Sequence, residues 1–284
     1  MIIAQITDLH VVERGEKMGG MVDTNGMAMN AMAHLKALVP QPDVVLATGD
    51  LTDHGTAGEY ALLRAMLDRL DLPYYVIPGN HDRRAALLDV FADHAQATAS
   101  GFVQYVVDQH PVRLIALDTI IEGQDDGLLC GERLAWLDDT LGRAADRPTL
   151  IFMHHPPFET GVWWMDTAGL SGAAALRQII ARHPQVGCIV CGHIHRPIQT
   201  NWGGTRVTVA PSTGPQVHLD LVPESPPHFI MEPPACLLHV FDGRGFVTHT
   251  SYVDWPDKPV RIPPFITEWE HIKDAWRTRK AALR

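Results

Sequence analysis

The feature that most constrains this fold is an alternation of short apolar runs with amphipathic stretches over the first two thirds of the 284-residue chain. Each run is bounded by turn residues or charges, as buried strands usually are. The five runs are 2–7, 44–48, 74–77, 149–153 and 186–191. Strands that alternate with helices predict a layered α/β fold rather than a sandwich of sheets alone or a helical bundle.

Helix and hairpin signals lie between and after these runs. Thr56 and Glu59 have the capping-box spacing of a helix start, and apolar residues then recur on one face. A second helix is expected from Ser171 to about residue 183, and an amphipathic basic helix from Glu268 onward. Two hairpins are expected, one pairing 102–107 with 112–117 and the other pairing 237–241 with 246–252.

Composition excludes several classes of protein. Hydrophobic residues make up 46% and charged residues 20%, which is typical of a folded globular chain. The formal net charge of −10 disfavours a nucleic-acid polymer as partner. No run reaches the roughly 18 apolar residues of a membrane span, and the N-terminus lacks the features of a signal peptide. Four cysteines form no disulfide framework, so we expect a cytoplasmic protein that does not engage a membrane.

Polar motifs follow the predicted strands. They read Asp8-Leu9-His10, Gly49-Asp50, Gly79-Asn80-His81-Asp82, His154-His155-Pro156-Pro157 and Gly192-His193-Ile194-His195. The carboxyl ends of such strands share one edge of a sheet, so five loops are expected to meet there. Each motif alone has a plain explanation as a turn or a strand end, but together they supply mixed oxygen and nitrogen donors. That set suits Zn, Mn, Fe or Co and indicates a two-metal centre.

These motifs, in this order, resemble the signature of the calcineurin-like metallophosphoesterases over residues 1 to about 200. Spacing and length are most similar to the bacterial class III cyclic nucleotide phosphodiesterases and the metal-dependent glycerophosphodiesterases. The resemblance implies a four-layer αββα sandwich with the metal site above one end of its two central sheets. It also implies a cofactor of two divalent ions per chain and a small phosphodiester as substrate.

The resemblance assigns the ligands position by position. It gives Asp8, His10 and His195 to the first ion, Asn80, His154 and His193 to the second, and Asp50 to both. His155 is then placed behind the ligands.

Two ions and two carboxylates leave a site near +2, which attracts a phosphodiester anion. A water held between the ions becomes hydroxide near neutral pH and attacks phosphorus. His81 is the best-placed proton donor to the leaving group.

The substrate pocket is less fully specified. Phe158, Trp163 and Trp164 follow the His-His-Pro-Pro motif and are expected either as a wall for the leaving group or as packing at the pocket rim. Asn80 and His81 are expected to contact the phosphate. Related phosphodiesterases often have a histidine where this chain has Pro215, and His218 is the candidate substitute for it.

The domain organisation is expected to have three parts. Residues 1–213 and 236–254 form the catalytic domain, the Pro-rich 214–235 an inserted cap or dimerisation arm, and 255–284 a C-terminal tail. By resemblance to oligomeric relatives, the chain is expected to form a homo-oligomer, a dimer or higher. A phosphomonoesterase of the same superfamily and a non-catalytic metal-binding scaffold are the alternatives, and the sequence leaves the native substrate open.

Overall fold

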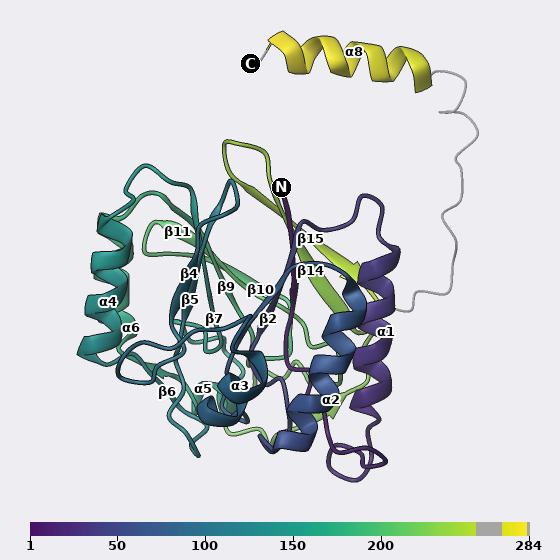
Figure 1. Ribbon diagram of the computed structural model, residues 1–284, viewed down its shortest axis with the longest axis vertical. Helices are drawn as coiled ribbons and strands as arrows, with labels where there is room; N and C mark the ends of the chain where they lie inside the picture. Colours follow the sequence, from purple (N-terminus) through teal and green to yellow (C-terminus); the bar gives the residue numbers. More distant parts are fainter. Residues whose placement is uncertain (254–268, 283–284) are drawn as a thin grey trace. The chain divides into compact units, whose positions relative to one another are not determined.

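The computed structural model describes residues 1–253 and 269–282. Two sheets form its centre (Figure 1). The five-stranded sheet has the order β15-β14-β1-β2-β3, made of Phe246–Tyr252, Ala235–Phe241, Ile2–Ile6, Val44–Thr48 and Tyr74–Ile77. The six-stranded sheet has the order β10-β11-β9-β7-β5-β4, made of Ile198–Trp202, Thr205–Val209, Val186–Cys191, Thr149–Met153, Arg113–Leu117 and Tyr105–Val107. The strands that precede the polar motifs are parallel to one another within each sheet.

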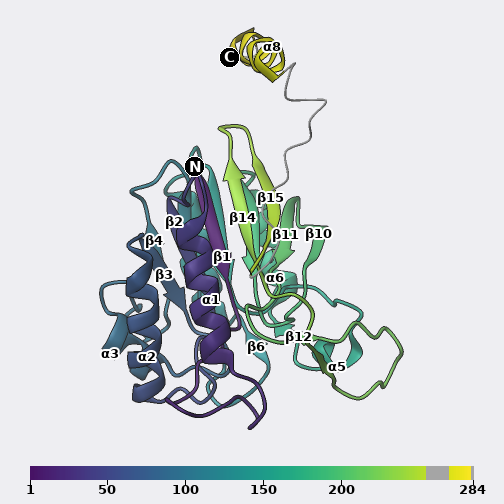
Figure 2. The same ribbon diagram turned by 90° about the vertical axis from the view of Figure 1, so that its right-hand side faces the viewer.

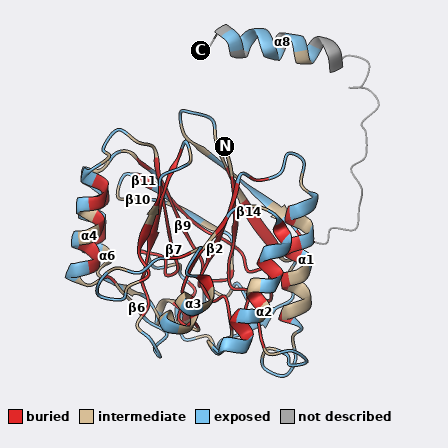
Figure 3. Ribbon diagram, viewed as in Figure 1, coloured by how far each residue is buried: buried red, intermediate tan, exposed pale blue. Residues whose placement is uncertain are grey.

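Helices cover the outer face of each sheet. Helices α1 (Thr24–Ala37), α2 (Ala57–Leu67) and α3 (Arg84–Phe91) pack with the five-stranded sheet, and α4 (Gly131–Gly142) and α6 (Ala173–Arg182) pack with the six-stranded sheet. The side chains of β7 alternate between the two cores, with Leu150 and Phe152 facing the other sheet and Ile151 and Met153 facing α4 and α6. The buried faces of helices and strands meet in the two cores (Figure 3). The predicted four-layer αββα arrangement is confirmed.

Short elements occupy the connections. They are the 3₁₀ turn η1 (Asp68–Leu70), the one-turn helix α5 (Trp163–Asp166), the two-stranded pair β6 (Gly127–Leu128) and β8 (Leu170–Ser171), and the two-stranded pair β12 (Gln216–Val217) and β13 (Phe229–Ile230). The second of these pairs holds together the arm 214–235. Figure 2 shows α5 and β12 at the same end of the molecule.

The local predictions hold with small changes of boundary. The Thr56 side chain accepts a hydrogen bond from the Glu59 amide, and the Glu59 side chain accepts one from the Thr56 amide, so the capping box is confirmed. Both hairpins form, with β4 beginning at Tyr105 rather than residue 102. The helix expected from Ser171 begins at Ala173, because Leu170–Ser171 first pairs with Gly127–Leu128.

The C-terminal residues form a separate unit. The chain divides into Met1–Asp254 and Trp255–Arg284. Helix α8 (Trp269–Ala282) lies within the region where the sequence predicted a basic helix, with Ile272 and Trp276 exposed on it. The Pro-rich start of the predicted tail, 255–268, lies outside the described residues. No helix among the described residues is long and apolar enough to cross a membrane.

Candidate metal centre

The seven predicted ligand residues are all buried and lie just beyond the carboxyl ends of five strands. Asp8 and His10 follow β1, Asp50 follows β2, Asn80 follows β3, His154 follows β7, and His193 and His195 follow β9. Because parallel strands of both sheets end on the same side, positions nearly 190 residues apart in the sequence reach one another. His193 shows this directly, since its backbone N–H lies 3.1 Å from Asp8 Oδ1.

One group of donor atoms surrounds His195 Nε2. This nitrogen lies 3.2 Å from His10 Nε2 and 3.4 Å from Asp8 Oδ1. Two atoms bound to one ion at about 2.1 Å are separated by about 3.0 to 3.4 Å in octahedral or tetrahedral geometry. The spacing of these three side chains therefore fits a shared cation, and with Asp50 they form a buried cluster of metal-binding character.

A second group of donor atoms surrounds Asn80 Oδ1. This oxygen lies 3.0 Å from His154 Nε2 and 3.1 Å from His193 Nδ1. Asp50 lies between the two groups, with its Oδ2 atom 3.4 Å from His154 Nε2 and 3.8 Å from His10 Nε2. One carboxylate oxygen within reach of both groups is the position that a bridging ligand needs.

Hydrogen bonds to the second nitrogen of each imidazole orient all four rings. His10 Nδ1 donates to Asp53 Oδ1 at 3.0 Å, His154 Nδ1 to the Thr48 carbonyl at 2.9 Å, His193 Nε2 to the Ala168 carbonyl at 3.2 Å, and His195 Nδ1 to the Pro215 carbonyl at 2.8 Å. The remaining nitrogens then carry lone pairs that face one another and the carboxylates. Such a cluster is stable only with a proton or a cation among its members, and this tautomer pattern is typical of metal-binding histidines.

Backbone strain is concentrated at this cluster. Seven non-glycine residues in the described part of the chain have a positive φ, and five of them are predicted ligands. The five are Asp8, His10, Asp50, His193 and His195, with φ between 43° and 72°. A left-handed backbone costs about 1 to 3 kcal/mol at such residues and is retained where the surroundings enforce it. This concentration of left-handed backbone at the predicted ligands favours a functional role for the cluster.

Asp82 connects two of the ligand loops. Its fully buried carboxylate accepts hydrogen bonds from the backbone N–H groups of Leu51 and Gly79 and from the hydroxyl of Tyr60. These bonds fix the loop of Asp50 against the loop of Asn80. Gly49 completes the junction, because its φ is +92° and a Cβ there would overlap the His154 ring. Asp82 therefore has a structural role in the centre, which the sequence analysis did not assign to it.

The charges of the cluster shift its pKa values. Burial would raise the pKa of Asp50, but the neighbouring His154 and His81 outweigh burial and hold it well below the ordinary value. Burial would lower the pKa of His154, but the charge of Asp50 and the hydrogen bond to it raise that pKa to about 9. The pKa of His193 is lowered, because burial and the adjacent His155 both oppose its protonation.

The donor atoms open into a cavity of about 510 Å³. Its lining combines predicted ligands with other side chains: His10, Asp50, Asn80, His193, His195, His81, Met18, Asp125, Trp164, Met165, Thr167, Ala168, Val217, Pro227 and Phe229. His81 is partly exposed to this space. Its Nδ1 donates to the Asp53 carbonyl at 2.9 Å, and its backbone N–H donates to Asp50 Oδ1 at 2.9 Å. The hydrogen bonds that hold His81 in place thus use Nδ1 and the backbone N–H, and neither of them uses Nε2.

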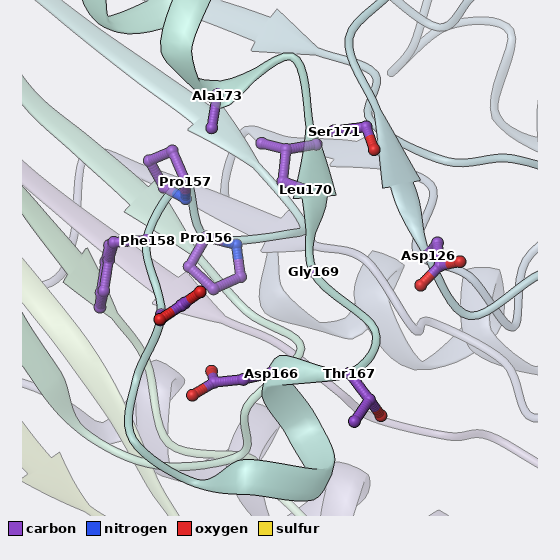
Figure 4. Close-up of a pocket in the computed structure, with 11 residues that line it drawn as sticks. Asp126, Pro156, Pro157, Phe158, Asp166, Thr167, Gly169, Leu170, Ser171 and Ala173 are labelled. Atoms are coloured by element: carbon purple, nitrogen blue, oxygen red, sulfur yellow. The ribbon is translucent and has the colours of Figure 1, made fainter.

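Other residues predicted for the site lie elsewhere. Trp163 is 45% exposed and does not line this cavity, although its neighbour Trp164 does. His218 is exposed and its ring faces His228, so the structure does not bring it to the ligands. Phe158 lines a neighbouring cavity of about 470 Å³ (Figure 4). His155 is buried beside His154 and His193, but Thr119 and the Asp125 carbonyl occupy both of its nitrogens, which supports a position behind the ligands.

Sequence reasoning missed the partners of the ligands. Asp53 orients His10, and Pro215 orients His195 through its carbonyl oxygen, which any residue type supplies. Asp53 had a weak signal in its position three residues after Asp50, whereas Pro215 had none. Phe229 reaches the cavity from the arm 214–235, more than thirty residues beyond the last motif, so no local pattern linked it to the site.

Comparisons with known proteins agree with this geometry. The pattern of the calcineurin-like phosphoesterase family matches residues 1–197. The chain is 37% identical over 276 residues to a "probable glycerophosphodiester phosphodiesterase" of Arcobacter nitrofigilis, covering 96% of this chain and 100% of that one. It is 31% identical to the 3′,5′-cyclic adenosine monophosphate phosphodiesterase of Escherichia coli, covering 74% of this chain and 75% of that one.

A structural comparison gives the same fold. A dimetal phosphatase from Danio rerio superposes with a TM-score of 0.67 at 16% identity, covering 89% of this chain and 96% of that one.

Proposed function

The chain belongs to the calcineurin-like phosphoesterase family, and on that basis we propose that it is a phosphodiesterase that holds two divalent metal ions and hydrolyses small phosphodiesters. The observation that supports this most directly is the convergence of two donor groups on one shared carboxylate, Asp50. Asp8, His10, His195 and Asp50 would hold one ion, and Asn80, His154, His193 and Asp50 the other. Mn, Fe, Zn and Co all suit this mixed set of nitrogen and oxygen donors.

Bound divalent ions supply Lewis acidity for the phosphoryl oxygens and an activated water as nucleophile. The protein residues contribute binding and proton transfer. The amide of Asn80 points toward the ligand group and lines the cavity beside His81. We propose that His81 donates a proton from Nε2 to the leaving oxygen. Hydrogen bonds from Nδ1 and from the backbone N–H fix the residue in place, and His81 lines the cavity.

The charge of the cavity supports a diester rather than a monoester. A phosphodiester carries one negative charge, whereas a phosphomonoester near neutral pH carries close to two. Among the described residues that line the cavity there is no Lys or Arg to hold a second negative charge, and the lining includes the acidic residue Asp125. The phosphomonoesterase alternative is therefore disfavoured. The non-catalytic scaffold is disfavoured as well, because the donors face an open cavity with His81 at its side.

A direct test compares metal content with turnover. Apoprotein loaded with Mn, Co or Zn is expected to bind two ions per chain and to hydrolyse bis(p-nitrophenyl) phosphate. Asp50→Ala and Asn80→Ala are expected to abolish turnover, whereas the exposed Asp146→Ala and Asn201→Ala are matched controls that keep it. Fewer than two ions per chain, together with unchanged turnover in the first two variants, would overturn the proposal.

We also propose that the arm 214–235 caps the catalytic domain and contributes to a homo-oligomer. Val217, Pro227 and Phe229 of the arm line the cavity, which supports a capping role. Outside the cavity, the arm also exposes the large apolar side chains of Leu219, Leu221, Val222 and Met231. Clustered exposed apolar residues favour an interface. Light scattering after size-exclusion chromatography tests this, and a monomer at micromolar concentration would contradict it.

Cellular location stays a prediction. All four cysteines are free, and Cys188, Cys191 and Cys236 are buried, which supports a reducing compartment. The absence of a nucleic-acid partner also stays a prediction, based on the net charge of −10.

A further inference from the structure

One wall of the metal cavity is apolar and aromatic. Trp164 of α5 and Phe229 of β13 contact each other edge to face, with their ring centroids 6.1 Å apart. Met165, Val217 and Pro227 continue this wall. Phe229 is 52% exposed, and its ring centroid lies 5.7 Å from that of His195. A partly uncovered aromatic ring therefore lies next to a predicted metal ligand.

The backbone ties both rings to the ligands. The segment after Trp164 supplies the Ala168 carbonyl that orients His193, and the Thr167 hydroxyl donates to the Trp164 carbonyl at 2.6 Å. On the other side, Pro215 directly precedes strand β12, and its backbone carbonyl orients His195. Gln216–Val217 then pairs with Phe229–Ile230. The same short segments therefore set the positions of the rings and of the metal-binding nitrogens.

Aromatic rings that line a cavity are suited to stacking, and Phe229 is exposed while Trp164 is partly buried. A large apolar side chain that stays uncovered forgoes about 1.5 to 3 kcal/mol of burial free energy, and stacking of a nucleobase on an aromatic side chain contributes about 1 to 3 kcal/mol. A short polyol or an ethanolamine group has no flat face and would leave the wall uncovered. A planar ring in the alcohol part of the substrate would cover it.

We propose that Trp164 and Phe229 form a specificity wall that binds a planar aromatic or heteroaromatic ring carried by the alcohol part of the substrate. This inference rests on the proposed phosphodiesterase function and deepens it by naming the substrate class. The preferred substrates are then diesters, cyclic or open, whose alcohol bears such a ring, rather than diesters of small polyols alone. The ring binds against the wall while the phosphate lies at the ligand cluster.

The test compares two substrates in the manganese-loaded full chain: 3′,5′-cyclic AMP, which carries a base, and glycerophosphoethanolamine, which carries no ring. Wild type is expected to have the higher kcat/KM for cyclic AMP. Phe229→Ala and Trp164→Ala are expected to lower the ratio of the two kcat/KM values about 5- to 150-fold each, the range that corresponds to the stacking free energy. Turnover of glycerophosphoethanolamine is expected to stay near that of wild type.

Two further variants separate stacking from a general disturbance of the arm. Ile230→Ala changes the next residue of β13, which does not line the cavity, and should leave the ratio unchanged. Phe229→Tyr keeps a ring and should retain the wild-type ratio. Manganese content and melting temperature of each variant show whether the metal centre is intact.

A wild-type preference for glycerophosphoethanolamine, or equal losses on both substrates in the two alanine variants, would overturn the inference while leaving the phosphodiesterase function in place. Loss of metal-dependent turnover on every diester, in the wild type itself, would instead overturn the proposed function.

Discussion

Asp53→Asn is expected to weaken the binding of one of the two ions and to leave the binding of the other unchanged. Asp53 is 11% exposed in its side chain, and its carboxylate accepts the Nδ1 proton of His10, a predicted ligand of only one of the two ions. The substitution keeps the shape of the side chain and removes its charge. The hydrogen bond from His81 Nδ1 goes to the backbone carbonyl of Asp53 and stays in place. The Asp53 carboxylate also lies 3.7 Å from His81 Nδ1 and 3.6 Å from His54 Nε2, but neither His81 nor His54 is a predicted metal ligand.

The size of the effect follows from this one contact. A hydrogen bond to a charged group contributes about 1.5 to 3 kcal/mol, which is a factor of about 10 to 150 in a binding constant. Loss of a carboxylate behind a metal-binding histidine typically costs about 10- to 100-fold in affinity. We therefore expect Asp53→Asn to weaken the ion held by His10, His195 and Asp8 about 10- to 100-fold. The ion held by Asn80, His154 and His193 should keep its affinity.

The assay is a titration of apoprotein with Mn²⁺ by isothermal calorimetry, with two classes of site fitted. Asp146→Asn is the matched control, because Asp146 is exposed in the connection after α4. Equal weakening of both classes, or no weakening of either, would refute the reasoning that Asp53 acts through His10 alone.

Three further predictions follow from the same contacts. Gly49→Ala should lower the melting temperature and prevent binding of the ion at His154, because the new Cβ overlaps that ring and φ is +92°; a variant with wild-type manganese content would contradict this. Because the pKa of His154 is raised to about 9, its proton competes with the metal, so metal affinity should rise with pH until about 9 and binding at pH 7 should release a proton. Calorimetry in buffers of different ionisation enthalpy measures the release, and zero release would contradict the prediction. His81→Gln should lower kcat about 100- to 10,000-fold for alkyl leaving groups and much less for p-nitrophenolate, which leaves without a proton; equal losses on both would show that His81 is not the donor.

The pH dependence of His81 has a definite sign. Burial would lower the pKa of His81, but the charge of Asp50 and the hydrogen bond to the Asp53 carbonyl outweigh burial and raise it. A proton donor with a raised pKa keeps its proton to higher pH. Activity should therefore fall on the alkaline side as His81 loses its proton, with a midpoint above about 6.5, the ordinary pKa of a histidine side chain.

The sequence by itself determined the layers and the ligand set. The strand 44–48 is buried at every position and apolar at all but its last residue, Thr48, because both of its faces are covered, and such a run can be recognised from the local sequence. Metal chemistry restricts which residue types bind an ion, so Asp8, Asn80 and His195 remain recognisable at strand ends without knowledge of their distances. The sequence analysis did not delimit helix α1, because weak helix formers such as Asn25 and Gly26 stand at its start. Packing of its buried face stabilises this helix more than local propensity does.

Only the tertiary structure decided which groups support the ligands and which walls surround them. The Pro215 and Ala168 carbonyls orient His195 and His193, and a backbone carbonyl has no sequence signature. Phe229 entered the cavity and His218 did not, although both belong to the arm, because the pairing of β12 with β13 fixes which residues face inward. Side-chain identity specifies chemistry locally, whereas the direction in which a side chain points depends on contacts between segments far apart in the chain.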